Sequence, residues 1–450
     1  MKTKNILITA ITILSCIAST QAQNVYIPNS IFKAALVNNA RINTNRDTSI
    51  QVSEAAAYAG AIHVSGLGIT DLTGIAAFVA LDSLDCSSNQ IAGLNVSANT
   101  ALTYLDCSGN RLLKILQGLE GTYYIYFLDT LDVSANTALT ILKCNNNGLL
   151  SLNTTGLTDL TYLDCSGNER GSFNPMTSNQ WEHISSPLLN FSSNTALTYL
   201  NCSDNALSSL NVSACTALTY LDCSGNENKY DETNRLSSLD ISVCKALATL
   251  ICNFNILTNL NVSAFKALTY LDCSSNPLTN LNVSGCTALA TLDCSRNALS
   301  SLNISSCTAL IGLSCGLNSL LSLNVKNGKN RQMNFGAVGN AILCIEVDDA
   351  AWSKIYWDDK KDATAFFSED CSGVGINTID KSMVPQVYPN PTTGNIYLSE
   401  NTNIVLTDLL GNLLLEQKNT NQLDISALPP GMYFIRVGDN LKQTFKIIKE

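Results

Sequence analysis

Tyrosine and aspartate recur two residues apart in short segments that read YLD, and they are the first candidates for binding chemistry in this sequence. The pairs are Tyr104 and Asp106, Tyr162 and Asp164, Tyr220 and Asp222, and Tyr270 and Asp272. Residues two apart in a β-strand point to the same face, so each pair presents an aromatic ring beside a carboxylate. Such a surface suits a sugar or a protein ligand. The competing interpretation, which we favour for the columns taken alone, is that copying of near-identical segments produces them without any ligand.

Three inserted segments, residues 111–130, 169–187 and 227–234, interrupt the pattern and hold a second set of candidates. Each departs from the pattern with different residues, and loops of this kind often carry function, with aromatic side chains as anchors. The candidate ligand-binding residues are Tyr123, Tyr124 and Tyr126 in the first segment, Trp181, Glu182 and His183 in the second, and Tyr230 and Asp231 in the third. The alternative is that these side chains fold back onto the framework, and the two interpretations are balanced.

Catalytic constellations are not found in the sequence. It contains no H-E-x-x-H, G-x-S-x-G, C-x-x-C or glycine-rich phosphate loop, and its only histidines are His63 and His183. A net charge of −10 without a basic cluster argues against nucleic-acid binding. We therefore predict no catalytic residue and no nucleic-acid partner.

A polar loop near the N-terminus resembles the calcium loop of EF-hand or dockerin modules. Asn43, Asn45, Asp47, Ser49 and Glu54 occupy its first, third, fifth, seventh and twelfth positions. Asn43 replaces the usual aspartate, and Thr48 replaces the glycine of the sharp turn. The sequence favours a helical cap over residues 23–60, with calcium as the alternative and no other cofactor expected.

The framework behind these candidates is a repeat marked by cysteine. Ten cysteines are each followed three residues later by asparagine: Cys86, Cys107, Cys144, Cys165, Cys202, Cys223, Cys252, Cys273, Cys294 and Cys315. Most intervals between them are 21 residues long. A fixed period of this size is typical of a solenoid, in which each coil buries its apolar side against its neighbours.

The repeat unit L-x-x-L-x-C-x-x-N-x-L-x-x-L-x-V resembles the leucine-rich repeat family, and its first coil is similar to internalin-type repeats. The resemblance implies an α+β/β solenoid of about eleven coils with parallel strands over residues 61–330. The leucine and cysteine of each YLDC strand are predicted to point inward. The asparagines are expected to bond the backbones of neighbouring coils.

The cysteine count suggests a disulfide framework for an exported protein. The repeat gives a better account, because a small apolar thiol packs well at an inward position, and we expect the ten to be free and buried. Cys344 and Cys371 lie outside the pattern, in a C-terminal cap expected over residues 331–371, and we predict a disulfide between them.

The two ends of the chain indicate export. Residues 1–22 have the basic start, short apolar run and small-residue cleavage site of a signal peptide, and no later segment is apolar enough to span a membrane. After a linker over residues 372–383, residues 384–450 resemble the C-terminal sorting domain of the type IX secretion system. The resemblance rests on Tyr388 to Pro391, Asp408 to Gly411, Leu423 to Ser426, Gly431 to Tyr433 and Lys446 to Lys449. It implies a small β-sandwich, recognition by the secretion machinery, and a secreted or outer-membrane surface location in a Gram-negative bacterium.

Together these features predict a secreted or cell-surface leucine-rich repeat protein that binds an extracellular protein or glycan without catalysis, in adhesion or ligand capture. One alternative is an extracellular polysaccharide hydrolase that uses carboxylates of the inserted loops. Another is a purely structural coat protein. A solenoid scaffold serves many partners, so its fold does not name the ligand.

Overall fold

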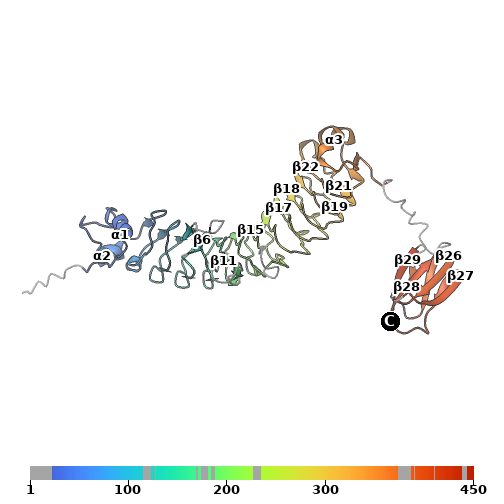
Figure 1. The fold of residues 1–450 in the computed structure, drawn as a ribbon, viewed down its shortest axis with the longest axis horizontal. Helices are drawn as coiled ribbons and strands as arrows, with labels where there is room; N and C mark the ends of the chain where they lie inside the picture. The colour runs from blue at the N-terminus through green and yellow to red at the C-terminus, as the bar shows by residue number, and fades with distance from the viewer. Residues whose placement is uncertain are drawn as a thin grey trace, which may run out of the picture. The chain divides into compact units, whose positions relative to one another are not determined.

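The structure is a computed structural model that describes residues 23–114, 123–126, 128–168, 171–173, 181–183, 188–226, 235–372, 387–389, 391–409, 411–437 and 443–450. The signal peptide predicted for residues 1–22 lies outside them. The chain forms two compact units, Met1–Glu369 and Asp370–Glu450, and each is described by itself (Figure 1). In the described part of the chain, no helix is long and apolar enough to cross a membrane.

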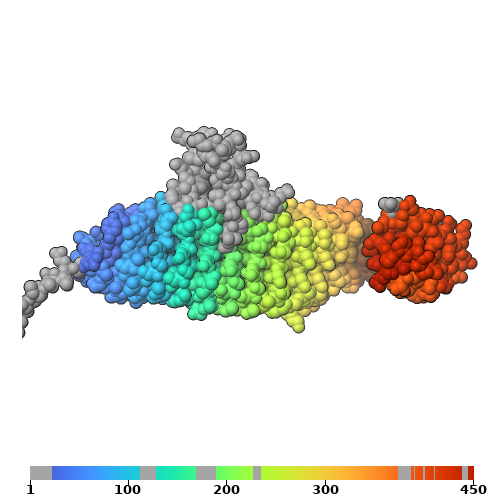
Figure 2. Space-filling view, turned by 90° about the horizontal axis from the view of Figure 1, so that it is seen from below, coloured from blue at the N-terminus to red at the C-terminus, as the bar shows by residue number. Residues whose placement is uncertain are grey.

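The first unit is built on one long sheet of twelve short parallel strands. In spatial order they are β1 (Ala61–His63), β2 (Ser83–Asp85), β4 (Tyr104–Asp106), β8 (Ile141–Lys143), β10 (Tyr162–Asp164), β14 (Tyr199–Asn201), β15 (Tyr220–Asp222), β16 (Thr249–Ile251), β17 (Tyr270–Asp272), β18 (Thr291–Asp293), β20 (Gly312–Ser314) and β22 (Asn334–Gly336). Each coil therefore contributes one strand in chain order. Figure 2 shows the coils as successive bands of colour along this unit.

Shorter parallel ladders form a second side of the solenoid. They are β3 (Leu94–Asn95) with β7 (Leu131–Asp132), β9 (Ser151–Asn153) with β13 (Leu188–Asn190), and the four-stranded sheet of β19 (Ser301–Asn303), β21 (Ser322–Asn324), β23 (Cys344–Glu346) and β24 (Phe366–Ser368). In Figure 1, β17, β18 and β22 of the long sheet follow the inner side of the curved region, and β19 and β21 follow its outer side. The long sheet is therefore the concave face there.

The interior is dry and follows the period-two pattern of the strands. Leu105 and Cys107 of one coil, and Leu221 and Cys223 of another, are fully buried. The residues that flank each leucine are mostly half-exposed. This alternation confirms the predicted inward direction of leucine and cysteine, because side chains alternate between the two faces of a strand.

Asparagine side chains tie neighbouring coils together. The Oδ1 atom of Asn89 accepts hydrogen bonds from the backbone N–H groups of Leu67 (3.1 Å) and Ile69 (2.9 Å). Its Nδ2 atom donates to the carbonyl oxygens of Val64 (2.8 Å) and Cys86 (3.0 Å). The same pattern recurs at the later repeat asparagines, so the predicted ladder is present and satisfies backbone groups that the turns leave unpaired.

Short helices close the two ends of the solenoid. At the N-terminus these are α1 (Ser30–Val37), α2 (Val52–Ala57) and the 3-10 turn η1 (Ile75–Ala77), and at the C-terminus α3 (Ala350–Tyr356) with η2 (Asn330–Gln332) and η3 (Asp358–Lys360). The C-terminal segment is more regular than expected, because β22, β23 and β24 continue strand pairing beyond Val325. Phe335, Ile345 and Phe367 take the inward positions there, and the Trp357 ring stacks on Phe335 at 4.5 Å.

The second unit is an antiparallel sheet. Its strands are β25 (Val387–Tyr388), β26 (Asn395–Thr407), β27 (Leu413–Asp424), β28 (Gly431–Val437) and β29 (Gln443–Lys449). A separate small core, with Ile396, Leu406, Ile435 and Ile447 buried, holds the sheet together. The alternating segments of the tail thus form a small antiparallel β domain, but its described strands join in one sheet rather than in the two sheets of the predicted sandwich.

Candidate functional site

The tyrosine column on the long sheet forms a stack of rings. Strand register places Tyr162 beside Tyr199 and Tyr199 beside Tyr220. The ring centroids of the first pair are 4.1 Å apart with planes inclined by 5°, and those of the second pair are 4.3 Å apart with planes inclined by 8°. The rings cover one another's faces, so a ligand meets mainly their edges and hydroxyl groups.

Partial burial changes the chemistry of these hydroxyl groups. Burial, together with a hydrogen bond and charge interaction with Tyr199, raises the pKa of Tyr162 to about 12. Burial also raises the pKa of Tyr220, with the nearby Asp222 carboxylate adding to the effect. The phenol groups of the stack, which can donate and accept hydrogen bonds, therefore stay neutral to a higher pH than an exposed tyrosine does.

The aspartates beside the stack are held in place by their own turns. The Oδ1 atom of Asp222 accepts hydrogen bonds from the backbone N–H (3.0 Å) and the hydroxyl group (2.6 Å) of Ser224. Asp106, Asp164 and Asp272 make the same pair of bonds with the serine two residues later. This geometry fixes one oxygen of each carboxylate and leaves Oδ2 for other partners.

Lys143 lies in the middle of these columns, between two tyrosines. Its Nζ atom is 5.6 Å from the centroid of the Tyr104 ring, 5.9 Å from that of Tyr162, and 3.9 Å from the Oδ2 atom of Asp106. Partial burial opposes the charge, but the contacts with Tyr104 and Asp106 outweigh it and raise the pKa of Lys143. The ammonium group is thus held by aromatic rings and a carboxylate together.

Tyr270 stands apart from the stack, because Thr249 lies between it and Tyr220 in the register of the sheet. The Tyr270 side chain is 37% exposed. Asp272, on the same strand, accepts a hydrogen bond at Oδ2 from the Asn253 amide (2.6 Å). The predicted Tyr–Asp columns are thus brought onto one face, but Lys143 and Thr249 divide them into segments.

The structure describes the backbone of some predicted loop-site residues but not their side chains. Tyr123–Tyr126 form strand β6, which pairs with β5 (Arg111–Lys114), and Trp181–His183 form β12, which pairs with β11 (Gly171–Phe173). Both pairs are antiparallel and lie within the insertions. The side chains of Tyr123, Tyr124, Tyr126, Trp181, Glu182 and His183 lie outside the described part, as do Tyr230 and Asp231 entirely, so these sites stay predictions.

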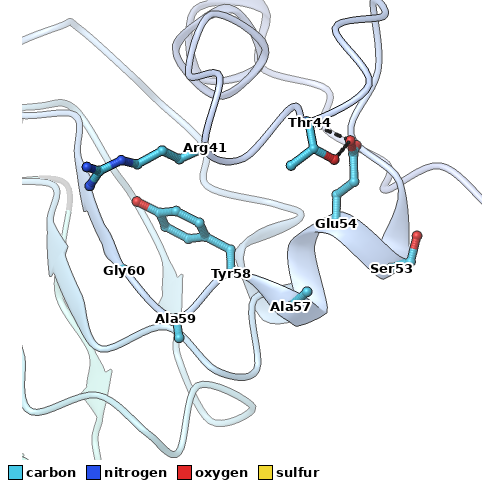
Figure 3. A pocket seen from close by; sticks show the side chains of 8 residues that line it. All are labelled: Arg41, Thr44, Ser53, Glu54, Ala57, Tyr58, Ala59 and Gly60. Carbon is cyan, nitrogen blue, oxygen red and sulfur yellow. Dashed lines mark hydrogen bonds between the residues drawn. The ribbon is translucent and has the colours of Figure 1, made fainter.

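The calcium-like loop is closed by its own hydrogen bonds. The Oε1 atom of Glu54 accepts from the N–H and hydroxyl of Thr44 (both 2.8 Å), and Oε2 accepts from the N–H of Gln51 (3.1 Å), as a capping box for α2. Asp47 accepts from Ser49 N–H (2.7 Å) and from the Gln51 amide (2.8 Å), and the Ser49 bond is the main cause that lowers the Asp47 pKa. Figure 3 shows Glu54 turned toward Thr44, with Arg41 and Tyr58 along the adjoining pocket.

A calcium ion would have to displace these donors from the carboxylates. Asn43 is buried, and its amide donates to the carbonyl oxygens of Val37 (2.9 Å) and Asp47 (2.8 Å), while Asn45 donates to Asp47 (3.0 Å). The described residues contain no cluster of three or more histidine, cysteine or acidic side chains that could hold a metal. The geometry fits a structural cap, and calcium binding at this loop stays a prediction.

Fourteen described cysteines are free and buried, in two columns. The ten repeat cysteines form one column, and burial raises the thiol pKa throughout it, as at Cys165 and Cys223. Cys215, Cys244, Cys286 and Cys307 form the other column, where Cys286 donates its S–H to the Val262 carbonyl oxygen of the preceding coil (3.1 Å). An earlier coil holds Asn99 at the equivalent position, and the Asn99 amide N–H donates to the Ile75 carbonyl oxygen (2.9 Å). A cysteine thiol can thus replace an asparagine amide as the donor at this position.

Cys344 and Cys371 are disulfide-bonded. Cys344 begins β23, and its strand pairs with β24 at the end of the four-stranded sheet. The bond therefore constrains the segment that follows the last strand of the solenoid.

The fold is that of a leucine-rich repeat solenoid and resembles the solenoids of internalins. The functional domain of InlJ from Listeria monocytogenes, which includes a cysteine ladder, superposes with a TM-score of 0.58 at 24% sequence identity, covering 95% of this chain and 98% of that one. A leucine-rich repeat protein from Leptospira interrogans superposes with a TM-score of 0.50 at 17% identity, covering 68% of this chain and 71% of that one. At these identities the likeness shows the fold.

Residues 386–450 match the secretion system C-terminal sorting domain family. The protein is accordingly a surface or secreted leucine-rich repeat protein exported by the type IX system of a Gram-negative bacterium. No curated protein sequence matches the chain significantly.

Sequence reasoning missed Lys143 as part of the site. Its signal was present, because Lys143 occupies the position that aspartate holds in the strands on either side. Only the structure places its ammonium group within reach of two rings and a carboxylate.

Proposed function

We propose that this protein is a non-catalytic capture or adhesion protein that binds an extracellular protein through the outward face of its long sheet. The observation that carries the proposal is the Tyr162–Tyr199–Tyr220 stack, flanked by the carboxylates of Asp164 and Asp222. Half-buried aromatic groups beside anchored carboxylates supply apolar contact and hydrogen bonding on one rigid surface. The predicted loop residues are a second part of the same proposal.

A protein ligand fits this surface better than a glycan does. Sugars commonly bind through the flat face of an aromatic ring, but the faces within this stack are covered by neighbouring rings at 4.1 and 4.3 Å. The exposed edges and phenol groups suit backbone carbonyls and basic side chains instead. A glycan ligand remains the second candidate through the more exposed ring of Tyr270.

The way the sheet carboxylates are used supports the non-catalytic part of the proposal. A glycosidase needs two carboxyl groups in a cleft, one of them free to donate a proton. Here the carboxylates of Asp106, Asp222 and Asp272 each hold a serine turn, and Asp106 also faces Lys143. The hydrolase alternative therefore depends on the Asp and Glu residues of the insertions, among them Glu182 and Asp231.

An array of extracellular proteins and glycans, probed with the exported full chain, tests the proposal. Binding to protein spots should be lost in a Tyr162→Ser/Tyr220→Ser variant. It should be retained in Leu321→Ser, which removes an exposed apolar side chain from the other side of the solenoid. No binding to any spot would favour a structural coat protein.

A version with the three insertions deleted separates the sheet from the loops. If it binds as well as the intact chain, the loop residues are not part of the site. If the sheet variant binds normally and the loop deletion does not, the site lies on the insertions.

A further inference from the structure

Two strands of the long sheet lack both the tyrosine and the aspartate, although the strands on either side carry both. Strand β8 has Ile141 and Lys143 in these positions and lies between β4 and β10. Strand β16 has Thr249 and Ile251 and lies between β15 and β17. Each is therefore flanked on both sides by a tyrosine and an aspartate, and we call the space above such a strand a slot.

The slot over β8 is filled by the chain itself. The Lys143 ammonium group lies between the Tyr104 and Tyr162 rings, 5.6 and 5.9 Å from their centroids, and 3.9 Å from Asp106. The two aromatic groups and the carboxylate thus act together on one cation. This arrangement shows that two tyrosine rings and an aspartate of a slot can hold an ammonium group.

The slot over β16, which we call the Tyr220–Tyr270 slot, has the same walls without a cation. The Tyr220 and Tyr270 rings stand two strands apart, which is roughly 10 Å at the usual strand spacing. Thr249 between them is much shorter than tyrosine, and Ile251 takes the place of Lys143. Among the residues that the structure describes, no basic side chain forms an ion pair or cation–π contact with Tyr220, Asp222, Tyr270 or Asp272.

The electrostatics of the Tyr220–Tyr270 slot favour a positive guest. Burial raises the pKa of Asp222, and repulsion from the Asp164 and Asp272 carboxylates raises it further. The hydrogen bonds from Ser224 lower the pKa but do not cancel this increase. Burial likewise raises the pKa of Tyr270, and all three charged neighbours that add to the effect, Asp272, Asp293 and Asp222, are carboxylates. A cation placed between the rings would relieve this repulsion.

We propose that the Tyr220–Tyr270 slot binds the ammonium group of a lysine side chain presented by the extracellular protein partner. The Tyr220 and Tyr270 rings enclose the side chain, and Asp222 and Asp272 pair with its charge, as Asp106 does with Lys143 in the slot over β8. The Asn253 amide, which donates to Asp272 (2.6 Å), keeps that carboxylate at the slot wall. This inference rests on the proposed function, because it names the group that the sheet recognises.

A short acetylated peptide with one lysine between glycines, and the same peptide with norleucine instead, are the probes. Binding to the full exported chain is measured by titration calorimetry or by NMR at low ionic strength. The lysine peptide should bind about tenfold more tightly than the norleucine peptide, and added salt should weaken it. Equal binding of the two peptides, or no binding, would overturn the proposal.

An Ile251→Lys substitution places a lysine where Lys143 stands in the other slot. It should fill the slot from within and weaken binding of the lysine peptide by about tenfold or more. Ser301→Lys is the matched control, since it adds the same charge at an exposed position of the other sheet and should leave most of the binding intact. Equal losses in both variants would mean that only the net charge matters, and the slot would be rejected.

The reverse change tests whether the two slots are equivalent. Lys143→Ile should open the slot over β8 and raise the stoichiometry from one lysine peptide to two. Unchanged stoichiometry in a folded Lys143→Ile protein would contradict the role of the slot walls. Circular dichroism verifies that each variant is folded.

The slot and the proposed function fail in different ways. If the array identifies a protein ligand whose binding is insensitive to Ile251→Lys, the slot is wrong and the proposed function stands. If the lysine peptide binds the slot but no protein on the array is bound, the slot stands and the proposed function fails.

Discussion

The two faces of the long sheet contrast strongly, although they are made by the same three-residue strands. The inner face is almost uniform, with leucine and then cysteine buried in coil after coil. The outer face changes from strand to strand, with tyrosine, serine, isoleucine, threonine and glycine in one column. Each coil must match its neighbours inside, whereas outside it meets solvent, so only the outer face is free to vary toward a ligand.

The largest expected effect concerns the reactivity of the inner cysteines. Burial raises the thiol pKa at Cys165 and its neighbours, and the thiolate needed for reaction forms only after unfolding. With an ordinary stability, reaction with a disulfide reagent at pH 8 should be about four orders of magnitude slower in the folded protein than in urea. Rapid reaction of many thiols in the native protein would show that the cysteines are accessible to solvent, and would contradict the division into a buried inner face and a solvated outer face.

Side-chain truncations at two adjacent residues of one strand, one on each face of the sheet, compare the two faces directly. Leu221→Ala removes a fully buried side chain and should lower the free energy of unfolding by about 2–5 kcal/mol. Tyr220→Ala on the outer face removes one stacking partner and should cost about 1 kcal/mol. Urea unfolding followed by circular dichroism measures both, and equal losses would contradict the division into core and binding face.

The next largest effect on stability is expected from the asparagine ladder. Asn110 is fully buried, accepts from the N–H of Ile91 (3.0 Å) and donates to the carbonyl of Cys107 (2.7 Å). Asn110→Ala leaves these backbone groups unpaired and should lower the free energy of unfolding by about 1–3 kcal/mol. Asn303→Ala is the control, because Asn303 is exposed and accepts one bond from Ser305, so a loss of similar size there would argue against the ladder.

The smallest effect concerns Asp222 and depends on pH. Because burial and two neighbouring carboxylates raise its folded pKa, the folded state binds the proton more tightly, and stability falls as pH rises from the ordinary value of 3.8 through the folded value. Asp222→Asn should therefore stabilise the protein at pH 7 by less than about 1 kcal/mol and have little effect near pH 3.

Asn201 supports the use of asparagine as this replacement. It already holds the equivalent turn, accepting from Ser203 N–H (3.1 Å) and hydroxyl (2.8 Å). Thermal unfolding at both pH values measures the difference. A variant that is less stable at pH 7 would show that the Asp222 carboxylate is favoured where it stands.

Much of the fold could be predicted from the spacing of a few residue types. The interval of 21 residues between cysteines fixed the coils, and the period of two within YLDC fixed which side chains point inward. The strands β22 and β24 were missed, because phenylalanines Phe335 and Phe367 take the inward positions of leucine there. Backbone pairing tolerates that exchange, whereas a search for the repeated letters does not.

The candidate site was predicted less completely. The sequence placed Tyr220 and Asp222 on one outward face, but not the covering of one ring by the next, because ring orientation depends on the neighbouring strand. The structure also shows that the Cys286 thiol donates to the Val262 carbonyl oxygen of the preceding coil, a contact between coils that depends on the tertiary structure.

The sequence by itself determined the solenoid, its buried rows and its export tail, since each depends on local periodicity or on a motif read along the chain. Only the tertiary structure decided that the Lys143 ammonium sits between Tyr104 and Tyr162, and that no described basic side chain does so between Tyr220 and Tyr270. Those contacts join residues of three different coils. Their geometry depends on which strands are neighbours and on how side chains share the space above them.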